Sequence, residues 1–493
     1  MAANSPKKSS HSETERTFDV VESTMTPSFD GLLSVARVER FLTQQLECVY
    51  FDTPGRDLAR RQITLRSRAG GADAGWHLTL PAGPDTRTEV RAPFADGATA
   101  EPTVPEDLRD VVLAIVRDRP LTPVALISTS RTVEMLHGMS GAVVAEFCDD
   151  QVSASAVGGE EQRWREWKLE LAPGSDTALL DRLANRLLDA GAVPAGHGTK
   201  LTPILAAGPA GRASDVSTDS LHRAVAEQVG ELLDWDRAVR SDAYDSVHQM
   251  RVTTRKIRSL LQSAEGSFGI TDDNWILGEL RELADVLGAA RDAEVLAERY
   301  ERALDELPEA NVRGPVRERL VGGARMRYEH GWMRSLTAMR SQRYFRLLEA
   351  LEALAAADPP PPPPGQEPTR TTIASAYRHL RKAADAARAT DTDKDEALHR
   401  VRKRAKRLRY TAAATGSTKV ARRAKTIQTL LGHHHDSVLS RSHLSRQAEL
   451  AHTTGEDTFT YGLLFQREED LAQSYADQLA AALKKLHRAM RKS

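Results

Sequence analysis

Two different patterns of hydrophobic and polar positions divide the chain. From Glu13 to about Leu205, short β-prone runs alternate with turn formers such as Thr53-Pro54-Gly55, which is the pattern of an antiparallel barrel or sandwich. Two stretches in this part, near 107–117 and 176–190, have a helical period and predict helical insertions. The predicted strands are centred on residues 17–20, 48–51, 63–65, 76–80, 142–145 and 167–171.

The rest of the chain has a helical period and is rich in Ala, Leu and Arg. A Gly-, Ala-, Ser- and Pro-rich stretch at 206–218 predicts a linker before it, and six consecutive prolines within 358–369 predict an extended spacer. The predicted fold class is therefore α+β with several domains: an antiparallel β-tunnel or barrel with flanking helices, then an all-α domain of two four-helix bundles. We expect a disordered segment 1–11, a β domain 12–205, and a helical domain 219–490 with halves of about 219–357 and 370–490.

A basic stripe occurs once in each helical half. Both copies read His-x2-Arg-x3-[Arg/Lys]-x2-Arg, and at 100° per residue the four positions fall within an arc of about 80°. Apolar residues lie on an adjoining face, so each helix can pack by one side and present its cations on the other. The stripes are His248, Arg251, Arg255 and Arg258, and His399, Arg402, Lys406 and Arg409; the apolar faces are Val247, Met250, Ile257 and Leu261, and Leu398, Val401, Ala405 and Leu408.

Charged stripes of this kind are most often solvated helix faces. Two features favour a binding function here. A solvated face normally includes Glu or Asp at i±4, and neither window, 248–258 or 399–409, contains an acidic residue. Like charges at i, i+3 and i+7 destabilise a helix unless a ligand neutralises them, and the identical spacing argues against coincidence. We therefore expect both stripes to bind an anion.

Each half also contains the pattern Leu-Gly-x3-Asp, at 287–292 and at 431–436. A basic helix of this kind followed by Leu-Gly-x3-Asp resembles the CHAD family, the conserved histidine α-helical domain, over about residues 218–490. The segment that begins at Phe459 also resembles the family's C-terminal helix. The resemblance implies two pseudo-symmetric four-helix bundles that flank a basic groove, and inorganic polyphosphate as its ligand.

Three consecutive histidines at 433–435 invite comparison with a metal site. Adjacent helical residues point about 100° apart, so three in a row cannot chelate one ion from a regular helix. The sequence offers no Cys/His constellation that would complete a site. We expect one or two of these imidazoles to contact phosphate instead, and we assign His434 to the polyphosphate-binding set.

Acidic and basic residues alternate along several predicted strands of the N-terminal domain. Residues 13, 15 and 17 share one face of the first strand, and Arg66 and Arg68 share a face further on. Charges of both signs directed into one barrel are costly unless paired or solvated. A lumen that binds triphosphate through divalent cations explains both, because carboxylates hold the metal while Arg and Lys hold phosphate oxygens. Further charged positions are Arg87, Glu89, Arg131, Glu146, Asp149, Asp150, Glu166, Lys168, Glu170 and Lys200.

The order of these elements resembles the CYTH, or triphosphate tunnel metalloenzyme, family over about residues 11–205. Its marks are Glu-x-Glu at 13–15, Tyr-Phe-Asp-Thr at 50–53, Leu-Arg-x-Arg at 65–68 and Leu-Thr-Leu at 78–80. The tandem order also resembles bacterial CYTH–CHAD proteins. The resemblance implies Mg²⁺ or Mn²⁺ as cofactor, with Glu13, Glu15 and Glu170 as metal ligands, and a catalytic set of Glu13, Glu15, Arg66, Arg68, Arg87, Arg131 and Lys200.

Three positions depart from the family's pattern. Thr17 and Pro81 stand where the family has lysines, and Lys168 occupies the middle of a Glu-x-Glu-x-Glu strand. Losing one preorganised charge contact commonly costs ~10²–10³ in rate. Arg16 neighbours Thr17, but strand alternation directs it outward. Two interpretations stay open: a metal-dependent inorganic triphosphatase, and a degenerate tunnel kept as a structural or binding module.

Composition narrows the class of protein. No apolar run approaches the ~18 residues of a membrane span, and no apolar segment follows Lys7 and Lys8 as in a secretory signal. Cys48 and Cys148 predict two buried thiols in a reducing compartment rather than a disulfide. The net charge of −1 hides the cationic window 399–409, and polyanion binding depends on local potential. We expect a cytoplasmic protein without a membrane partner.

The leading hypothesis is an inorganic polyphosphate-binding protein whose basic helical domain binds the chain, together with a tunnel for which metal-dependent triphosphate hydrolysis stays open. The alternative is a non-enzymatic adaptor on polyphosphate granules with a degenerate tunnel. A nucleic-acid-binding protein is the least favoured alternative, because Tyr410 is the only aromatic residue beside the basic helices' cations and base stacking therefore has little support.

Overall fold

The structure is a computed structural model of the whole chain. It describes residues 9–71, 73–94, 103–196, 200–206, 220–263, 275–356, 373–390, 393–414 and 416–491. Most of the predicted N-terminal segment 1–11, the predicted linker from 207 to 218 and the predicted spacer 358–369 lie outside these residues.

Contacts within the chain divide it into two compact units. Unit 1 comprises residues 1–260 and 336–359, and unit 2 comprises residues 261–335 and 360–493. Unit 1 therefore holds the whole β domain and, in addition, helix α5 (Ser220–Arg240), most of α6 (Ser246–Ser263) and α9 (Gln342–Ala356).

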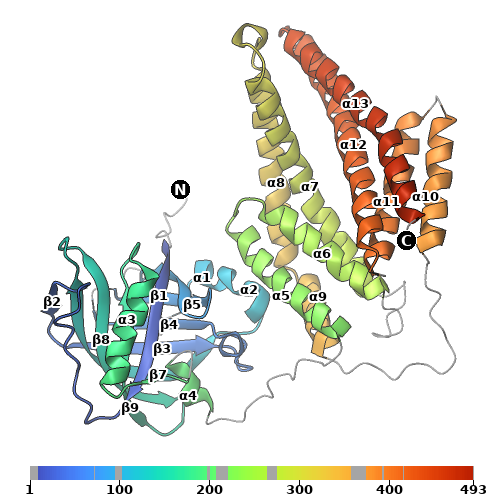
Figure 1. Cartoon of the computed structure of the whole chain (residues 1–493). Helices are drawn as coiled ribbons and strands as arrows, with labels where there is room; N and C mark the ends of the chain where they lie inside the picture. Colours follow the sequence, from blue (N-terminus) through green and yellow to red (C-terminus); the bar gives the residue numbers. More distant parts are fainter. Residues whose placement is uncertain are drawn as a thin grey trace, which may run out of the picture. The chain divides into compact units, whose positions relative to one another are not determined.

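The β domain is a closed antiparallel barrel (Figure 1). Within the described residues, eight strands follow in the order β1-β6-β5-β4-β3-β7-β8-β9, and β9 pairs with β1 to close the sheet. The short strands β10 and β2 pair with β1 and β7. The strands are β1 (Ser9–Val20), β2 (Arg37–Arg40), β3 (Gln44–Asp52), β4 (Thr64–Ala69), β5 (Gly75–Pro81), β6 (Thr86–Ala92), β7 (Thr122–His137), β8 (Val143–Ala156), β9 (Gln162–Leu171) and β10 (Val193–Pro194).

Strand alternation sorts side chains between the barrel interior and the outer faces that helices cover. Phe18 points outward and packs with Leu180 and Leu183 of α3 (Thr177–Asp189). The helices α1 (Glu106–Val111) and α2 (Leu113–Val116) cover the outer faces of β4, β5 and β6 in the same way. The two helical insertions predicted from the sequence are thereby confirmed.

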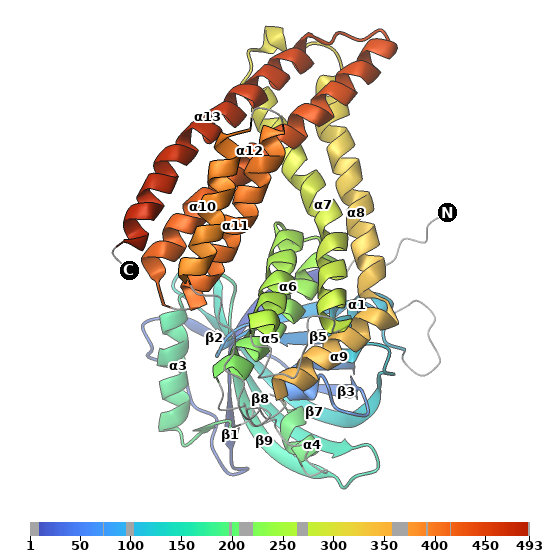
Figure 2. The same cartoon turned by 90° about the vertical axis from the view of Figure 1, so that its right-hand side faces the viewer.

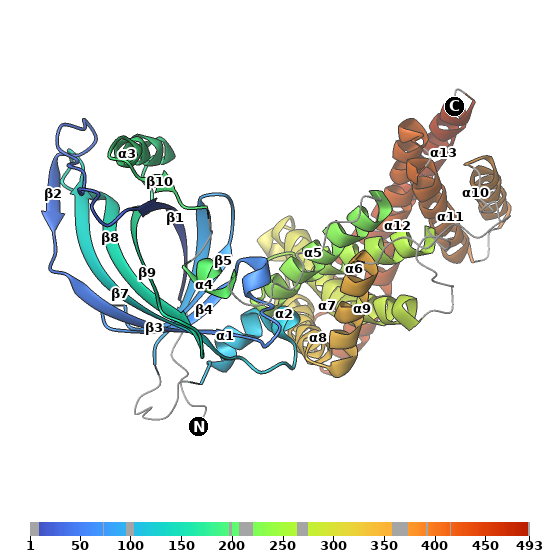
Figure 3. The same ribbon diagram turned by 90° about the horizontal axis from the view of Figure 1, so that it is seen from below.

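Helix α4 (Leu201–Ala206) fills one end of the barrel interior (Figure 3). Its residue Ile204 packs against Tyr50 and Ile127. Tyr50 is directly opposite Arg66 in the β3–β4 pair, and cross-strand partners point to the same side of the sheet. These contacts therefore belong to the inward face, and α4 closes the lumen from one side.

Within unit 1, buried ion pairs join α1 to α5. Arg240, at the last position of α5, is 8% exposed and donates to both carboxylate oxygens of Asp236, at 2.6 and 3.2 Å. It also donates to Asp110 of α1 at 3.0 Å and to the Met339 carbonyl at 2.9 Å. Tyr344 of α9 donates to Asp236 at 2.9 Å. One buried cation thus connects three elements.

A second cation connects α2 to α9. Arg117, the residue after α2, is 3% exposed and has a positive φ of 59°. It donates to Glu349 at 3.2 Å and to Glu352, which also binds Arg61. Within unit 1, the β domain is therefore joined to α5 and α9 by ion pairs of two buried cations, Arg240 and Arg117.

Unit 2 is all-helical (Figure 2). The helices α10 to α13 share a core that includes Leu380, Val401, Ile427 and Leu486. At Gly331 an added Cβ would lie 2.8 Å from backbone atoms of Ala290, so α7 and α8 approach one another too closely for a side chain there. Its helices are α7 (Trp275–Asp305), most of α8 (Gly323–Met339), α10 (Ile373–Arg388), α11 (Lys394–Ala414), α12 (Thr418–Thr453) and α13 (Phe459–Met490).

The predicted fold class, an antiparallel barrel with flanking helices followed by an all-helical region, is confirmed. The helical region has nine α-helices, α5 to α13, among the residues that the structure describes. In that same part of the chain, none of the helices has the length and apolar character needed to cross a bilayer. Cys48 and Cys148 are buried and not bonded to each other, as predicted for two thiols.

Candidate functional site

An acidic row on β1 faces the barrel interior. Because Phe18 points outward, the odd-numbered residues Glu13, Glu15 and Thr17 point inward. The β1–β9 register places Glu15 opposite Glu170 and Thr17 opposite Lys168. The predicted metal ligands are therefore brought together, and Glu13, Glu15 and Glu170 each offer an oxygen within 4.8 Å of the others.

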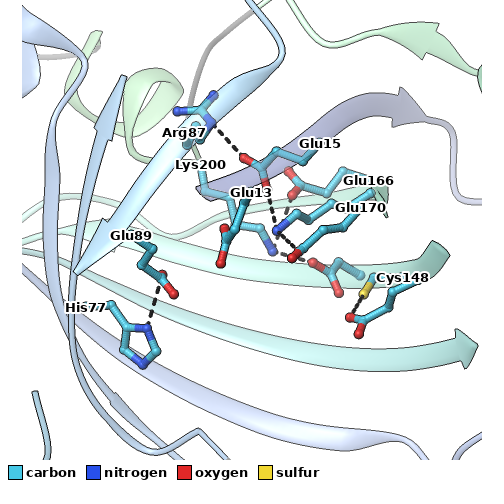
Figure 4. A network of polar contacts seen from close by, with 12 residues as sticks. Glu13, Glu15, His77, Arg87, Glu89, Cys148, Glu166, Glu170 and Lys200 are labelled. Atoms are coloured by element: carbon cyan, nitrogen blue, oxygen red, sulfur yellow. Dashed lines mark hydrogen bonds and ion pairs between the residues drawn. The ribbon is translucent and has the colours of Figure 1, made fainter. Parts of the chain in front are cut away.

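The ammonium group of Lys168 contacts Glu15 and Glu170, two of the carboxylates that are labelled in Figure 4. Its Nζ donates to Glu170 at 3.0 Å and forms a second, shorter contact with Glu15. Burial by itself would lower the pKa of Lys168, but the charges of Glu15, Glu170 and Glu13 hold that pKa well above its ordinary value. Lys168 therefore carries a permanent positive charge at the centre of the acidic row.

This arrangement does not fit a divalent ion. A doubly charged ion about 4 Å from an ammonium group meets a repulsion on the order of 8 kcal/mol at an effective dielectric constant of ~20. Glu15 also accepts from Arg87 at 2.6 Å, which leaves it little unsatisfied charge. Mg²⁺ or Mn²⁺ would have to displace the Lys168 side chain before Glu15 and Glu170 could hold it.

A second carboxylate, Glu89 on β6, is the centre of a buried cluster. It is 2% exposed and accepts from Arg66 at 3.3 Å, from His77 Nδ1 at 3.1 Å and from Arg91. Burial raises the pKa of Glu89, and His77 together with the two guanidinium groups lowers it by more, so the carboxylate is ionised. His11 and Glu13 lie within metal-ligand spacing of Glu89, but its three cationic or hydrogen-bonding neighbours already satisfy it.

A third cluster surrounds Asp150 on β8. Asp150 is fully buried and accepts a bidentate pair of hydrogen bonds from Arg131, at 2.8 and 2.7 Å, and one from Lys200 at 2.6 Å. Lys200 also lies 3.3 Å from Glu166. Burial would raise the pKa of Asp150, but Lys200 and Arg131 hold it well below the usual range. Lys200 reaches this position because it directly precedes α4.

The predicted phosphate-binding bases thus all point into the barrel, and each is paired with an acid. The fifth of these bases, Arg68, binds Asp73. Arg16 points outward as predicted, donating to Asp85 at 2.7 Å and to Asp181 at 2.8 Å, so it does not replace a lysine at position 17. The lumen is an ion-pair network in which cations and carboxylates neutralise one another.

The first basic stripe lies on α6. The predicted apolar face is confirmed, because Val247, Met250, Ile257 and Leu261 are each at most 1% exposed. The stripe side chains are only partly covered, except Arg255, which is exposed. The Nε atom of Arg258 is buried without a hydrogen-bond partner among the described residues.

The second stripe lies on α11. Its apolar face is likewise confirmed, with Leu398, Val401, Ala405 and Leu408 at most 4% exposed. Within the described part of the chain, Arg402, Lys406 and Arg409 form no ion pair with a carboxylate; Arg409 donates to Gln428 at 3.0 Å. The cations at 406 and 409 also lie over the Tyr410 ring.

The border of this stripe on α12 is uncharged. The His399 and His435 rings have centroids 4.8 Å apart. Gly432 lies under the guanidinium group of Arg402, where an added Cβ would be 3.7 Å from the nearest nitrogen. Residues 428, 432 and 435 therefore face residues 409, 402 and 399, and they bring no acid to the cations.

The three adjacent histidines have three different neighbours. His433 stacks on Tyr475, His434 Nε2 lies 3.5 Å from Asp395, and His435 is the one beside His399. His434 is 6% exposed, and burial lowers its pKa. The structure thus places His435, rather than the predicted His434, at the edge of the α11 stripe.

Comparison with known proteins identifies both parts. A CYTH domain model matches residues 13–184, and a CHAD domain model matches residues 223–445. The uncharacterized protein Rv2226 of Mycobacterium tuberculosis is 59% identical over all of both chains. The chain belongs to the CYTH–CHAD proteins.

Solved structures of single domains are more distant. The crystal structure of the CHAD domain from the plant Ricinus communis is 22% identical, covers 57% of this chain and 97% of its own, and has a TM-score of 0.41. A Hippeastrum protein for which a dominant triphosphatase activity is described is 15% identical, covers 40% of this chain and 98% of its own, and has a TM-score of 0.26.

Several residues of the CYTH lumen were not given a role from the sequence. Glu89, Asp150 and Glu166 appeared only as members of an alternating pattern, and His77 and Arg91 did not stand out. Their importance depends on cross-strand register, for example Arg66 opposite His77 and Thr79 opposite Glu89. The alternation of charge on β6 and β8 was the available signal.

Proposed function

We propose that the CHAD domain of this protein binds inorganic polyphosphate through the stripe His399, Arg402, Lys406 and Arg409 on α11. The observation that carries this proposal is the absence, among described residues, of any carboxylate paired with Arg402, Lys406 or Arg409, next to an uncharged border on α12. From 399 to 409 the stripe extends about 15 Å along the helix, which gives room for several phosphate groups.

The energetic argument is one of missing counter-charge. Cations at i, i+3 and i+7 repel one another, and the usual relief is an acid one turn away. Buried charges elsewhere in the molecule have such partners, as Asp150 does. A linear chain of phosphates supplies one negative charge or more at each step, and charge-assisted hydrogen bonds to phosphate are the stronger kind. The α6 stripe repeats the spacing and is assigned to the same ligand.

The test compares two double variants on one helix. Arg402→Glu/Lys406→Glu reverses two stripe charges, whereas Arg400→Glu/Arg404→Glu makes the same change in net charge on the opposite, exposed face. Titration with long-chain polyphosphate should show a loss of at least about a hundredfold for the stripe variant, because two contacts of about 1.5 kcal/mol each disappear. The control should lose less than about tenfold. Equal losses would show attraction by net charge alone and refute the site.

A competition experiment separates this ligand from nucleic acid. Tyr410 is the aromatic residue beside the stripe, and two neighbouring cations already cover its ring. Polyphosphate should therefore displace bound RNA at far lower phosphate concentration than RNA displaces polyphosphate. The reverse order would favour the nucleic-acid alternative.

The second candidate function is metal-dependent hydrolysis of short triphosphates in the CYTH lumen. The grouping of Glu13, Glu15 and Glu170 favours it, and enzymes of the CYTH family are metal-dependent. If metal did bind, these three would hold it and it would polarise phosphate oxygens, while Arg66, Arg87 and Arg131 would bind and orient the phosphates. Lys168 weighs against that arrangement, so we assign the lumen to binding.

Phosphate release decides between the two. The full chain with tripolyphosphate, ATP or long-chain polyphosphate should release no phosphate above background with either Mg²⁺ or Mn²⁺. Turnover that Glu15→Gln abolishes would establish the hydrolase instead.

An adaptor on polyphosphate granules needs only the helical site, so Arg251→Glu/Arg402→Glu should abolish retention on polyphosphate while Glu13→Ala leaves it unchanged.

A further inference from the structure

The acidic cluster of the lumen is built like a cation site and already contains a cation. Oxygens of Glu13, Glu15 and Glu170 lie within 4.8 Å of one another. The Nζ atom of Lys168 binds two of these three carboxylates, and the Lys168 side chain is 19% exposed. Arg87 contacts Glu15, and Arg91 contacts Glu13.

We propose that the ammonium group of Lys168 is a built-in counter-ion that takes the place of a divalent metal at this cluster, so that the lumen of this protein binds its ligand without metal. The ammonium group is covalently attached to β9, so unlike a bound metal ion it cannot dissociate. Glu15 and Glu170, which a metal would need, are oriented toward Nζ at hydrogen-bond distance. The inference concerns the lumen alone and is independent of polyphosphate binding by the helices.

The position opposite Lys168 supports this interpretation. Thr17 is its direct cross-strand partner, and it is the inward residue that follows Glu13 and Glu15 on β1. A lysine at 17 and an acid at 168 would place the cation one strand away and leave a fourth carboxylate in the cluster. The chain has the opposite arrangement, with an uncharged hydroxyl at 17 and the cation at 168.

The consequence can be tested by removing or moving that charge. Lys168→Gln replaces the lysine with an uncharged polar side chain that is one atom shorter, and it leaves three carboxylates without the ammonium group. Thr17→Lys/Lys168→Glu moves the cation across the strand pair and adds a fourth carboxylate. The net charge falls by one, as it does in Lys168→Gln, but the lysine at 17 still balances part of the acidic cluster, which protects the fold if the single variant is unstable. Lys168→Arg keeps the positive charge and is the matched control.

The measurement is direct binding of Mn²⁺ to the full chain. Two readouts report it: the electron paramagnetic resonance signal of the free ion and the shift of the melting temperature. The wild type and Lys168→Arg should show no saturable binding at this cluster. Lys168→Gln and the double variant should bind Mn²⁺ at least about tenfold more tightly and melt at a higher temperature when it is present. Adding Glu170→Gln to either should remove the gain.

Three results would overturn the proposal. One is Mn²⁺ binding by the wild type that Glu170→Gln abolishes, since the cluster would then accept metal beside Lys168. Another is a folded Thr17→Lys/Lys168→Glu variant that gains no affinity. The third is wild-type binding that persists in Glu170→Gln and disappears in His11→Ala, because the neighbouring cluster with Glu89 would then hold a metal in the same lumen. None of these outcomes depends on polyphosphate.

Discussion

His443 is a buried histidine whose surroundings oppose its protonation. Its Nδ1 atom lies 2.9 Å from the Tyr300 hydroxyl, and its Nε2 atom lies 3.1 Å from the guanidinium group of Arg327. Burial, and after it the charge of Arg327, lowers the pKa of His443 to about 4. The imidazole is therefore neutral at pH 7 and serves as a packing and hydrogen-bonding group in unit 2.

This low pKa predicts a dependence of stability on pH. The unfolded chain regains the ordinary pKa of 6.5, so between about pH 6.5 and 4 the unfolded state binds a proton that the folded state rejects. Stability should fall as the pH falls through this window, by at most ~3 kcal/mol. His443→Gln cannot take up the proton, so urea unfolding at pH 7 and at pH 4.5 should show a smaller difference for it. His452→Gln, at an exposed position, should behave like the wild type; equal slopes for all three would contradict the prediction.

At the residue scale, sequence reasoning located the charged side chains and missed their partners. The alternation at 13, 15 and 17 correctly predicted an inward row and an outward Arg16. Lys168 was recognised as a departure, yet its contact with both Glu15 and Glu170 required the β1–β9 register. That register is set by strands about 150 residues apart in the chain, and no local pattern encodes it.

Among the elements, the junction of α1 and α5 depends on one aspartate. Asp236 satisfies the buried Arg240 with two hydrogen bonds and accepts a third from Tyr344. A buried cation left without its partner is costly, because neither water nor another acid fully replaces the lost contact. Asp110 keeps one contact to Arg240, so the loss is not complete.

Asp236→Ala should accordingly destabilise the chain by roughly 3 kcal/mol. Its matched control is Asp234→Ala, two residues earlier on the same helix. The Asp234 side chain is 76% exposed and 3.8 Å from Arg237, so its removal should change stability by less than about 0.5 kcal/mol. Urea unfolding of both variants at pH 7 measures the difference; similar losses would mean that Arg240 finds another partner.

The helices themselves were the most predictable elements. The apolar residues of α6 and α11 were named from period alone and are all buried, because a helix that packs by one side must repeat its apolar residues at that spacing. The Gly of Leu-Gly-x3-Asp on α12 lies against the Arg402 guanidinium group, but an added Cβ there would be in ordinary van der Waals contact, so the space does not require a glycine. Which of the three histidines lies beside His399 could not be foreseen, since it depends on the rotation of α12 against α11.

For the whole molecule, the surprising feature is which parts fold together. The Gly- and Pro-rich stretch at 206–218 predicted a boundary between barrel and helices, yet α5 and α9 form one compact unit with the barrel. Arg117 is nearly inaccessible and binds Glu349 and Glu352 across that boundary. Composition predicts a linker, but it carries no information on the contacts that a later helix such as α9 makes with the barrel domain.

Arg117 allows a test of this union. In the full chain Arg117→Met removes two ion pairs, and Glu352 keeps only its contact with Arg61, so the melting temperature should fall by several degrees. In a fragment of residues 1–206 the partners are absent, and the same substitution should leave stability unchanged or raise it. Calorimetry of the wild type and Arg117→Met, in the full chain and in the fragment, measures the change in melting temperature. We expect a decrease in the full chain and no decrease in the fragment; a decrease of equal size in both would mean that Arg117 stabilises the barrel itself.

Helix α4 closes one end of the barrel. A ligand can enter a lumen that is closed at one end only through the open end, and it must leave through the same end. A linear phosphate could offer its terminus to the lumen while its remaining length stays outside, whereas a ring-shaped phosphate has no terminus to offer. Linear tripolyphosphate should therefore bind in this domain and cyclic trimetaphosphate should not, although each contains three phosphorus atoms.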